Sequence, residues 1–195
     1  MDFKQIPYLS GGRELCVPGC AILVASYDFL GDAIRACEGN HAFCNHAAAV
    51  VRTPDATGRE RVDIHLIESL EHGPTKTHLS DYFTGFKGRL FLFRPAGLTP
   101  EIQTAFTNFL AALVASHVRY DYLGLLENIA GHTAEIPAGK EIHECICSAE
   151  CGYAWERNGL PRKPDAPQHL VPQPPDLPVW WEADGPVIEL LGPFR

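Results

Sequence analysis

The segment HECICSAECGYAW, residues 143–155, gathers the residue types that are best suited to chemistry in this chain. Cys145, Cys147 and Cys151 lie close together, after His143 and before Trp155. Cysteines at this density can ligate a metal, form disulfides or supply one reactive thiolate. The rest of the sequence has to decide between these three kinds of site.

A disulfide framework is the least favoured of the three. The chain has seven cysteines, an odd number. Its first residues, MDFKQIPYLSGGRELC, lack the charged and then apolar pattern of a secretory signal peptide. These features predict free thiols in the cytoplasm, where most cysteines pack as small hydrophobic residues. Delivery by a secretion system or by host lysis stays open as an alternative.

A zinc site is the second alternative. Three groups contain candidate ligands: Cys16-x3-Cys20, His41-x2-Cys44-x-His46 and His143-x-Cys145-x-Cys147-x3-Cys151. Structural zinc sites commonly use knuckles with C-x2-C spacing, and the sequence contains none. The sequence therefore favours a protein without a metal or another cofactor, although alternate residues of one strand could still form a site.

A single nucleophile explains the segment best. If residues 148–158 form a helix, Cys151, Ala154 and Trp155 share one face, which is the face expected to pack in the core. Cys145 lies in a predicted strand and is expected to be structural. Cys147 falls where the chain enters the helix, and there the free backbone N–H groups and the helix dipole stabilise a thiolate.

A thiolate nucleophile requires a histidine base, and the base requires a polar group that orients it. His46 opens the predicted strand HAAAVV (46–51), whose small residues let another element approach the histidine closely. The returning strand, RVDIHLIESL (61–70), carries Glu68 on the face of its apolar residues. A carboxylate there is unusual unless it has a partner.

The role of Glu68 as the third residue has two alternatives: another residue could take the role, or Glu68 could have no role in the site. His65 lies on the same returning strand, but alternation places it on the face opposite to Glu68. Glu68 could also be a residue at the end of the strand that faces solvent.

The remaining pattern is typical of one soluble domain over residues 1–195. The net charge of −8 and the lack of a basic stripe argue against nucleic acid as a partner. No apolar run reaches the ~18 residues of a membrane span. The oligomeric state stays unknown. Residues 161–195 are rich in proline and are expected to form an extended segment packed on the domain. Strands are predicted at 21–26, 46–51, 61–70 and 89–95, and helices at 26–39, 99–118, 120–131 and 148–158.

The order of these parts resembles the circularly permuted papain-like hydrolases. That group includes the YiiX-like proteins and relatives of the NlpC-type cell-wall peptidases and of lecithin–retinol acyltransferase. Asn45 departs from the family, which often has serine before the histidine, and this departure leaves the class of substrate open. The resemblance covers roughly residues 17–180 and depends on NHAAAVV (45–51), LIES (66–69), YDYLG (120–124), CSAECGYAW (147–155) and PDL (175–177).

The resemblance implies an α+β fold, in which a small antiparallel sheet packs against helices and the catalytic cysteine lies at a helix N-terminus. It implies Cys147 as nucleophile, His46 as base and Glu68 as the third residue of a cysteine peptidase or amidase. The expected reaction is acyl transfer through a thioester, on an amide of a peptide or a peptidoglycan stem. One alternative is an acyltransferase or phospholipase acting on lipid acyl esters, because the apolar segment PVWWE (178–182) could suit a lipid. The other is a binding module without activity or stabilised by zinc. Tyr27 or Tyr120 could help to position the substrate.

Overall fold

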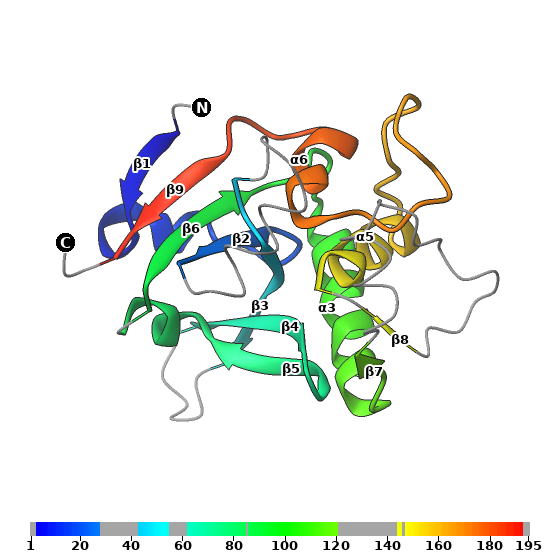
Figure 1. Cartoon of the computed structure of the whole chain (residues 1–195), viewed down its shortest axis with the longest axis horizontal. Helices are drawn as coiled ribbons and strands as arrows, with labels where there is room; N and C mark the ends of the chain where they lie inside the picture. The colour runs from blue at the N-terminus through cyan, green and yellow to red at the C-terminus, as the bar shows by residue number, and fades with distance from the viewer. Residues whose placement is uncertain are drawn as a thin grey trace.

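A seven-stranded sheet forms the centre of the molecule, in the order β1-β9-β6-β2-β3-β4-β5 (Figure 1). The structure is a computed structural model that describes residues 3–27, 43–54, 62–84, 86–120, 144–145 and 147–192. All neighbours are antiparallel except β1 and β9, which are parallel. The strands are β1 (Lys4–Pro7), β2 (Ala21–Ser26), β3 (His46–Pro54), β4 (Val62–Leu70), β5 (Gly73–His78), β6 (Gly88–Phe93) and β9 (Ile188–Leu191).

Two longer helices, α3 (Pro100–Ala115) and α5 (Cys147–Arg157), pack against each other beside the sheet (Figure 1). The chain therefore has the mixed α+β fold that the sequence predicted. A separate parallel pair joins β7 (Arg119–Tyr120) to β8 (Glu144–Cys145). The shorter elements are η1 (Tyr8–Gly12), α1 (Arg13–Leu15), η2 (Leu79–Phe83), η3 (Pro174–Asp176) and α6 (Leu177–Trp180).

The long helix begins where its capping signals predicted. The Oγ1 atom of Thr99 accepts a hydrogen bond from the N–H of Ile102, 3.3 Å away, and Pro100 occupies the first turn. The helix predicted at 26–39 cannot be compared over most of its length. Ser26 ends β2, and residues 28–39 lie outside the described ranges. The same holds for the helix predicted at 120–131, apart from Tyr120, which ends β7.

The sheet has a hydrophobic core on each face, because alternate residues of its central strands point in opposite directions. Ala47, Ala49 and Val51 of β3 belong to the core beneath the helices. Ala48 and Val50 belong to the core on the other face, which the N-terminal segment and η2 cover. Burial on both faces explains why the central strands read as continuous apolar runs.

The alanines of β3 let α5 pack directly on this strand. The face of α5 with Cys151, Ala154 and Trp155 is fully buried, as the helical spacing predicted. The indole Nε1 of Trp155 donates a hydrogen bond to the carbonyl of Gly19, 2.8 Å away, which satisfies its one polar atom. This packing brings the start of α5 towards the start of β3.

The C-terminal segment is more than an extended tail. Its last strand, β9, pairs with β1 on one side and with β6 on the other. Trp180 and Trp181 are buried in the core beneath the helices. The sheet is larger than the small sheet expected, because β1 and β9 extend it at one edge.

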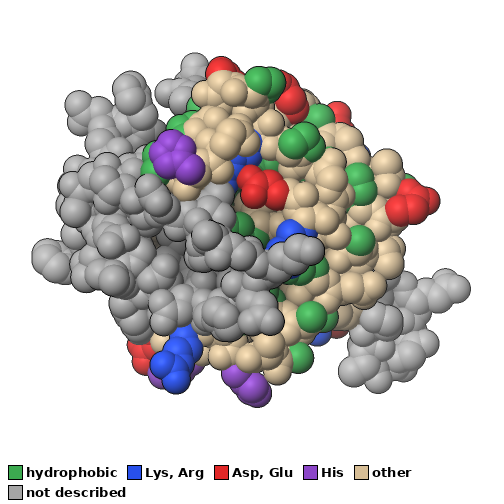
Figure 2. All heavy atoms as spheres, turned by 90° about the vertical axis from the view of Figure 1, so that its right-hand side faces the viewer, with side chains coloured by type: hydrophobic (Ala, Val, Ile, Leu, Met, Phe, Trp, Pro, Cys, Tyr) green, Lys and Arg blue, Asp and Glu red, His purple; other side chains and the backbone are tan. Residues whose placement is uncertain are grey.

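On the face shown in Figure 2, the described Lys and Arg side chains are separated by acidic and apolar ones and do not form one stripe. Within the part of the chain that the structure describes, we find no helix with the length and apolarity of a membrane span.

Candidate active site

Three of the predicted site residues meet in space, although they are far apart in the sequence. The Nε2 atom of His46 lies 2.7 Å from the Oε2 atom of Glu68. The His46 ring also hydrogen-bonds the side chain of Cys147. Because Nε2 is held by Glu68, Nδ1 is the ring nitrogen that is left for the sulfur. The imidazole thus lies between a carboxylate and a thiol.

The register of the hairpin explains the first of these contacts. β3 and β4 are antiparallel, and their last paired residues at this end are Ala49 and Ile67. His46 and Glu68 lie just beyond that pair, with side chains on the same face as Ala48 and Leu66. Residues that are diagonal across a ladder are within reach of each other when their side chains are long.

Asn45 fixes the point where β3 begins. Its N–H donates to the carbonyl of Val24, and its Oδ1 accepts from the N–H of Ser26, each over 2.8 Å. Its Nδ2 donates to the hydroxyl of the same serine over 2.9 Å. Asn45 therefore holds the backbone next to His46.

The carboxylate of Glu68 is fully buried and receives several hydrogen bonds. The Tyr82 hydroxyl donates to Oε2 at 2.5 Å, and Thr77 adds a further side-chain hydrogen bond. Burial by itself raises the pKa of Glu68, but the bonds from His46, Thr77 and Tyr82 outweigh it and lower the pKa. Glu68 is therefore ionised at neutral pH. The burial of Tyr82 and the neighbouring charge of Glu68 raise the pKa of Tyr82.

His46 has the electrostatic environment of an imidazolium. Burial disfavours its charged form, but the neighbouring Cys147 and Glu68 outweigh burial and raise the pKa of His46 to about 10. The residue itself is only half-buried, with 18% of its side chain exposed, so a substrate can approach it. Cys147 is 5% exposed and is the first residue of α5.

His65, the alternative third residue, does not contact His46. Its Nδ1 lies 3.0 Å from the hydroxyl of Thr53, and its ring packs edge-on against that of His78. The structure therefore places Glu68, and not His65, on the imidazole, as expected from strand alternation.

The other cysteines whose side chains are described, Cys16, Cys20, Cys44 and Cys151, are buried and form no disulfide. Burial raises the pKa of Cys16 to about 12 and that of Cys20 to about 11. Within the described ranges, no three His, Cys, Asp or Glu side chains are grouped so that they could hold a metal ion. His41, His143 and the side chain of Cys145, which belong to the zinc alternatives, lie outside the described residues.

Sequence reasoning missed two features around the site. Tyr82 and Thr77 contact Glu68 from η2 and β5, and nothing in their local sequence signals this. Glu150 was also missed, although its spacing places it one helical turn after Cys147 on the same side of α5. It is completely buried, and Ser69 donates a hydrogen bond to it over 2.6 Å.

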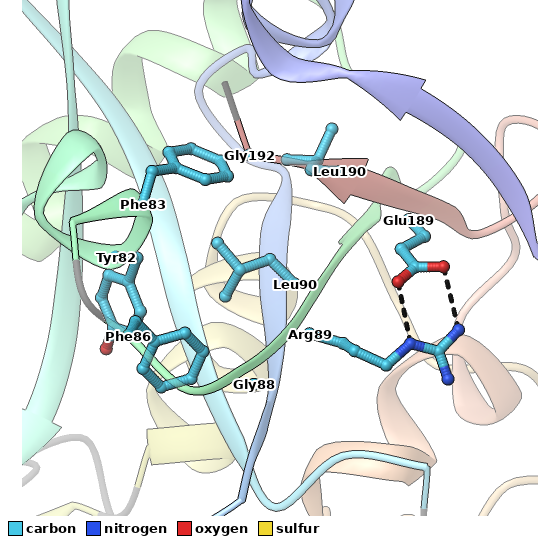
Figure 3. Close-up of a pocket in the computed structure, with 9 residues that line it drawn as sticks. All are labelled: Tyr82, Phe83, Phe86, Gly88, Arg89, Leu90, Glu189, Leu190 and Gly192. Atoms are coloured by element: carbon cyan, nitrogen blue, oxygen red, sulfur yellow. Dashed lines mark hydrogen bonds and ion pairs between the residues drawn. The ribbon is translucent and has the colours of Figure 1, made fainter. Parts of the chain in front are cut away.

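Tyr82, whose hydroxyl bonds Glu68, also lines a small pocket of about 110 Å³ (Figure 3). Phe83, Phe86 and Leu90 line this pocket. The guanidinium of Arg89 binds both carboxylate oxygens of Glu189, over 2.8 and 2.9 Å. Tyr27, suggested as a substrate contact, is half exposed and hydrogen-bonds Arg89. The side chain of Tyr120 lies outside the described residues.

Comparison with known proteins gives a likeness in structure. No family model matches the chain, and no curated protein sequence matches it. Among solved structures, it is similar to the crystal structure of the metalloprotein YiiX from Escherichia coli O157:H7, of DUF1105. The TM-score is 0.53 at 13% sequence identity, over 91% of this chain and 89% of the other. At this identity the likeness shows a YiiX-like fold.

The word metalloprotein describes that neighbour, so we tested whether the residues around His46 fit a metal. The Oε2 atom of Glu68 already accepts from both His46 and Tyr82, and the described side chains form no set of three metal ligands. These residues do not match a metal site, so the reaction proposed below contains no step through a metal.

Proposed function

We propose that the protein is a cysteine hydrolase that works by acyl transfer, with Cys147 as nucleophile, His46 as acid and base, and Glu68 as the residue that orients His46. The observation that carries this proposal is the chain of hydrogen bonds from Glu68 through His46 to Cys147. An adjacent base, held in turn by a third polar group, is the arrangement that activates a thiol. The YiiX-like fold and the resemblance to permuted papain-like hydrolases support the same proposal.

In the first half of the reaction, the sulfur of Cys147 attacks the substrate carbonyl while His46 carries the proton. The tetrahedral oxyanion lies near the free backbone N–H groups in the first turn of α5, whose dipole stabilises negative charge. His46 then protonates the leaving amine, the carbon–nitrogen bond breaks and a thioester remains on Cys147.

In the second half, His46 takes a proton from water, and the resulting hydroxide attacks the thioester carbonyl. The carbon–sulfur bond breaks, His46 returns its proton to the sulfur of Cys147, and the acid product leaves. Glu68 stays ionised throughout and stabilises each imidazolium that forms, without taking the proton itself.

The proposed substrate is an amide in a peptide or a peptidoglycan stem. The sequence feature that could have suited a lipid, the tryptophan pair of PVWWE, packs inside: Trp180 is 6% exposed and Trp181 is 1% exposed. This packing removes the observation that favoured a lipid acyl ester.

A panel of peptide, thioester and phospholipid reporters tests the proposal. We expect the thioester and peptide reporters to be hydrolysed by the unchanged protein and by neither Cys147→Ala nor His46→Ala. Hydrolysis of the phospholipid alone would replace the amide with a lipid ester as substrate. No turnover of any reporter, with the thiol of Cys147 no more reactive than that of Cys151, would contradict the proposed activity.

A further inference from the structure

Glu150 is a buried acid beside the candidate site, and the reaction proposed above does not use it. It lies in the first turn of α5, three residues after Cys147, and none of its surface is exposed. Its Oε2 atom accepts a hydrogen bond from the Ser69 hydroxyl over 2.6 Å. Its other oxygen, Oε1, is buried and has no hydrogen-bond partner among the residues that the structure describes. A buried acid with so few partners calls for a physical explanation.

The hydrogen bond from Ser69 links the two elements that carry the site. Ser69 directly follows Glu68 on β4, and Glu150 lies one turn beyond Cys147 on α5. The bond therefore ties the strand that orients His46 to the helix turn that presents the sulfur. Ser69 is itself buried, with 1% of its surface exposed, so water does not compete for this bond.

The charge of Glu150 also reaches the site. No cation binds its carboxyl among the described residues, and His46 of β3 and Glu68 of β4 are the charged groups that act on it. Burial is the largest effect and raises the pKa of Glu150 to about 7, while the Ser69 bond and the positive charge of His46 oppose this rise. Glu150 thus changes charge near neutral pH, and its ionised form favours the imidazolium of His46.

We propose that Glu150 is a positioning residue of this site: its bond to Ser69 fixes the first turn of α5 against β4, and its carboxyl sets the charge next to His46. The inference rests on the proposed role of Cys147 and His46. It assigns Glu150 no contact with the substrate.

Two substitutions separate the anchor from the charge. Glu150→Gln keeps a side chain that can bond Ser69 but removes the ionisation. Ser69→Ala keeps the carboxyl but removes the anchor. Cys151→Ala is the matched control, because Cys151 is equally buried in the same helix and has no place in the proposed site.

The measurement is the rate of Cys147 alkylation by iodoacetamide from about pH 5 to about pH 9, mapped by mass spectrometry. The unchanged protein should show an inflection near neutral pH, and Glu150→Gln should lose it while melting at a similar or higher temperature. Ser69→Ala should be slower by about tenfold at every pH, because a small displacement of the sulfur weakens its pairing with His46. Adding Glu150→Ala to Ser69→Ala should slow alkylation little further, since both changes remove the same hydrogen bond between Ser69 and Glu150. The double variant should also lose the inflection, because the carboxyl is gone.

A profile of Glu150→Gln that superimposes on that of the unchanged protein would overturn the inference, and so would Ser69→Ala alkylated at the unchanged rate. In both cases a reactive Cys147 would leave the proposed nucleophile standing. If Cys147 of the unchanged protein reacts no faster than Cys151, the proposed function fails and this inference fails with it. Cys151→Ala is expected to keep both the rate and the inflection.

Discussion

The Nε2 atom of His46 lies 2.7 Å from the buried carboxylate of Glu68, a residue on the neighbouring strand. This contact leaves the other ring nitrogen of His46 for Cys147, the first residue of α5. A hairpin and a helix that are distant in the sequence therefore meet at one imidazole.

Cys147 should be the most reactive of the described thiols. It alone combines a helix start with a histidine partner, whereas burial raises the pKa of Cys16 and Cys20 to about 12 and about 11. Limited alkylation with iodoacetamide at neutral pH, followed by peptide mapping, should modify Cys147 first. Earlier modification of Cys16, Cys20, Cys44 or Cys151 in the folded protein would contradict the assignment.

Glu68→Gln should lower turnover of a thioester reporter by about 100-fold or more, because the amide cannot stabilise the imidazolium and favours the wrong tautomer of His46. Glu189→Gln is the matched control, since Glu189 is also a buried carboxylate of the sheet, paired with Arg89 instead of with the site. The control should keep its turnover and lose stability. The loss should be on the order of 1 kcal/mol, because Arg89 is partly exposed and solvent weakens its ion pair with Glu189. Equal losses of turnover in the two variants would show a general effect of removing a buried charge.

Glu150→Gln should change how stability depends on pH. Burial raises the pKa of Glu150 from 4.5 to about 7, so between these values the folded chain holds a proton that the unfolded chain has lost. The contribution of Glu150 to stability is thus present at low pH and is lost as the pH rises through this window. The quantity to compare is the free energy of unfolding of Glu150→Gln minus that of the unchanged protein. This difference should be higher at about pH 8 than at about pH 4 by on the order of 3 kcal/mol.

Urea unfolding of both proteins at several pH values measures this difference, in which the other titrating groups cancel. A constant difference between the two proteins across the window would show that Glu150 has an ordinary pKa in the fold. If this difference instead fell as the pH rose, Glu150 would be stabilised in the fold as a carboxylate.

Cys147→Ala and Cys151→Ala should have opposite effects. Cys147→Ala should abolish turnover and leave a folded chain, because only one sulfur at the start of a helix is removed. Cys151→Ala should keep turnover and lower the free energy of unfolding by about 1 kcal/mol, because Cys151 is fully buried in the core beneath the helices. Thermal melts and the reporter assay together distinguish the two roles, and a loss of turnover in Cys151→Ala at unchanged stability would contradict them.

Local pattern was enough to predict several elements of the fold, among them β4, which carries Glu68. The apolar run AILVAS, the alternation of VDIHLIESL and the capping signals before α3 each predicted an element that the structure contains. Alternation along β4 also distinguished Glu68 from His65. These features depend only on neighbours in the sequence, which is why they can be read from it.

Contacts between distant segments could not be predicted in the same way. β9 is short, and it is a strand only because β1 and β6 lie on either side of it. The bond from Tyr82 to Glu68 depends on where η2 packs over the sheet. Glu150 lay on a predicted helix, but its burial against Ser69 depends on how closely the alanines of β3 let α5 approach.

The most direct test of the account is to trap the acyl group on the enzyme. The protein is mixed with p-nitrophenyl acetate, quenched in acid and analysed by intact mass and peptide mapping, while the release of p-nitrophenolate is followed. We predict one acetyl group as a thioester on Cys147, formed with a burst of p-nitrophenolate, absent in Cys147→Ala and strongly slowed in His46→Ala. An acetyl group on another residue, or a burst of the same size in Cys147→Ala, would contradict the account.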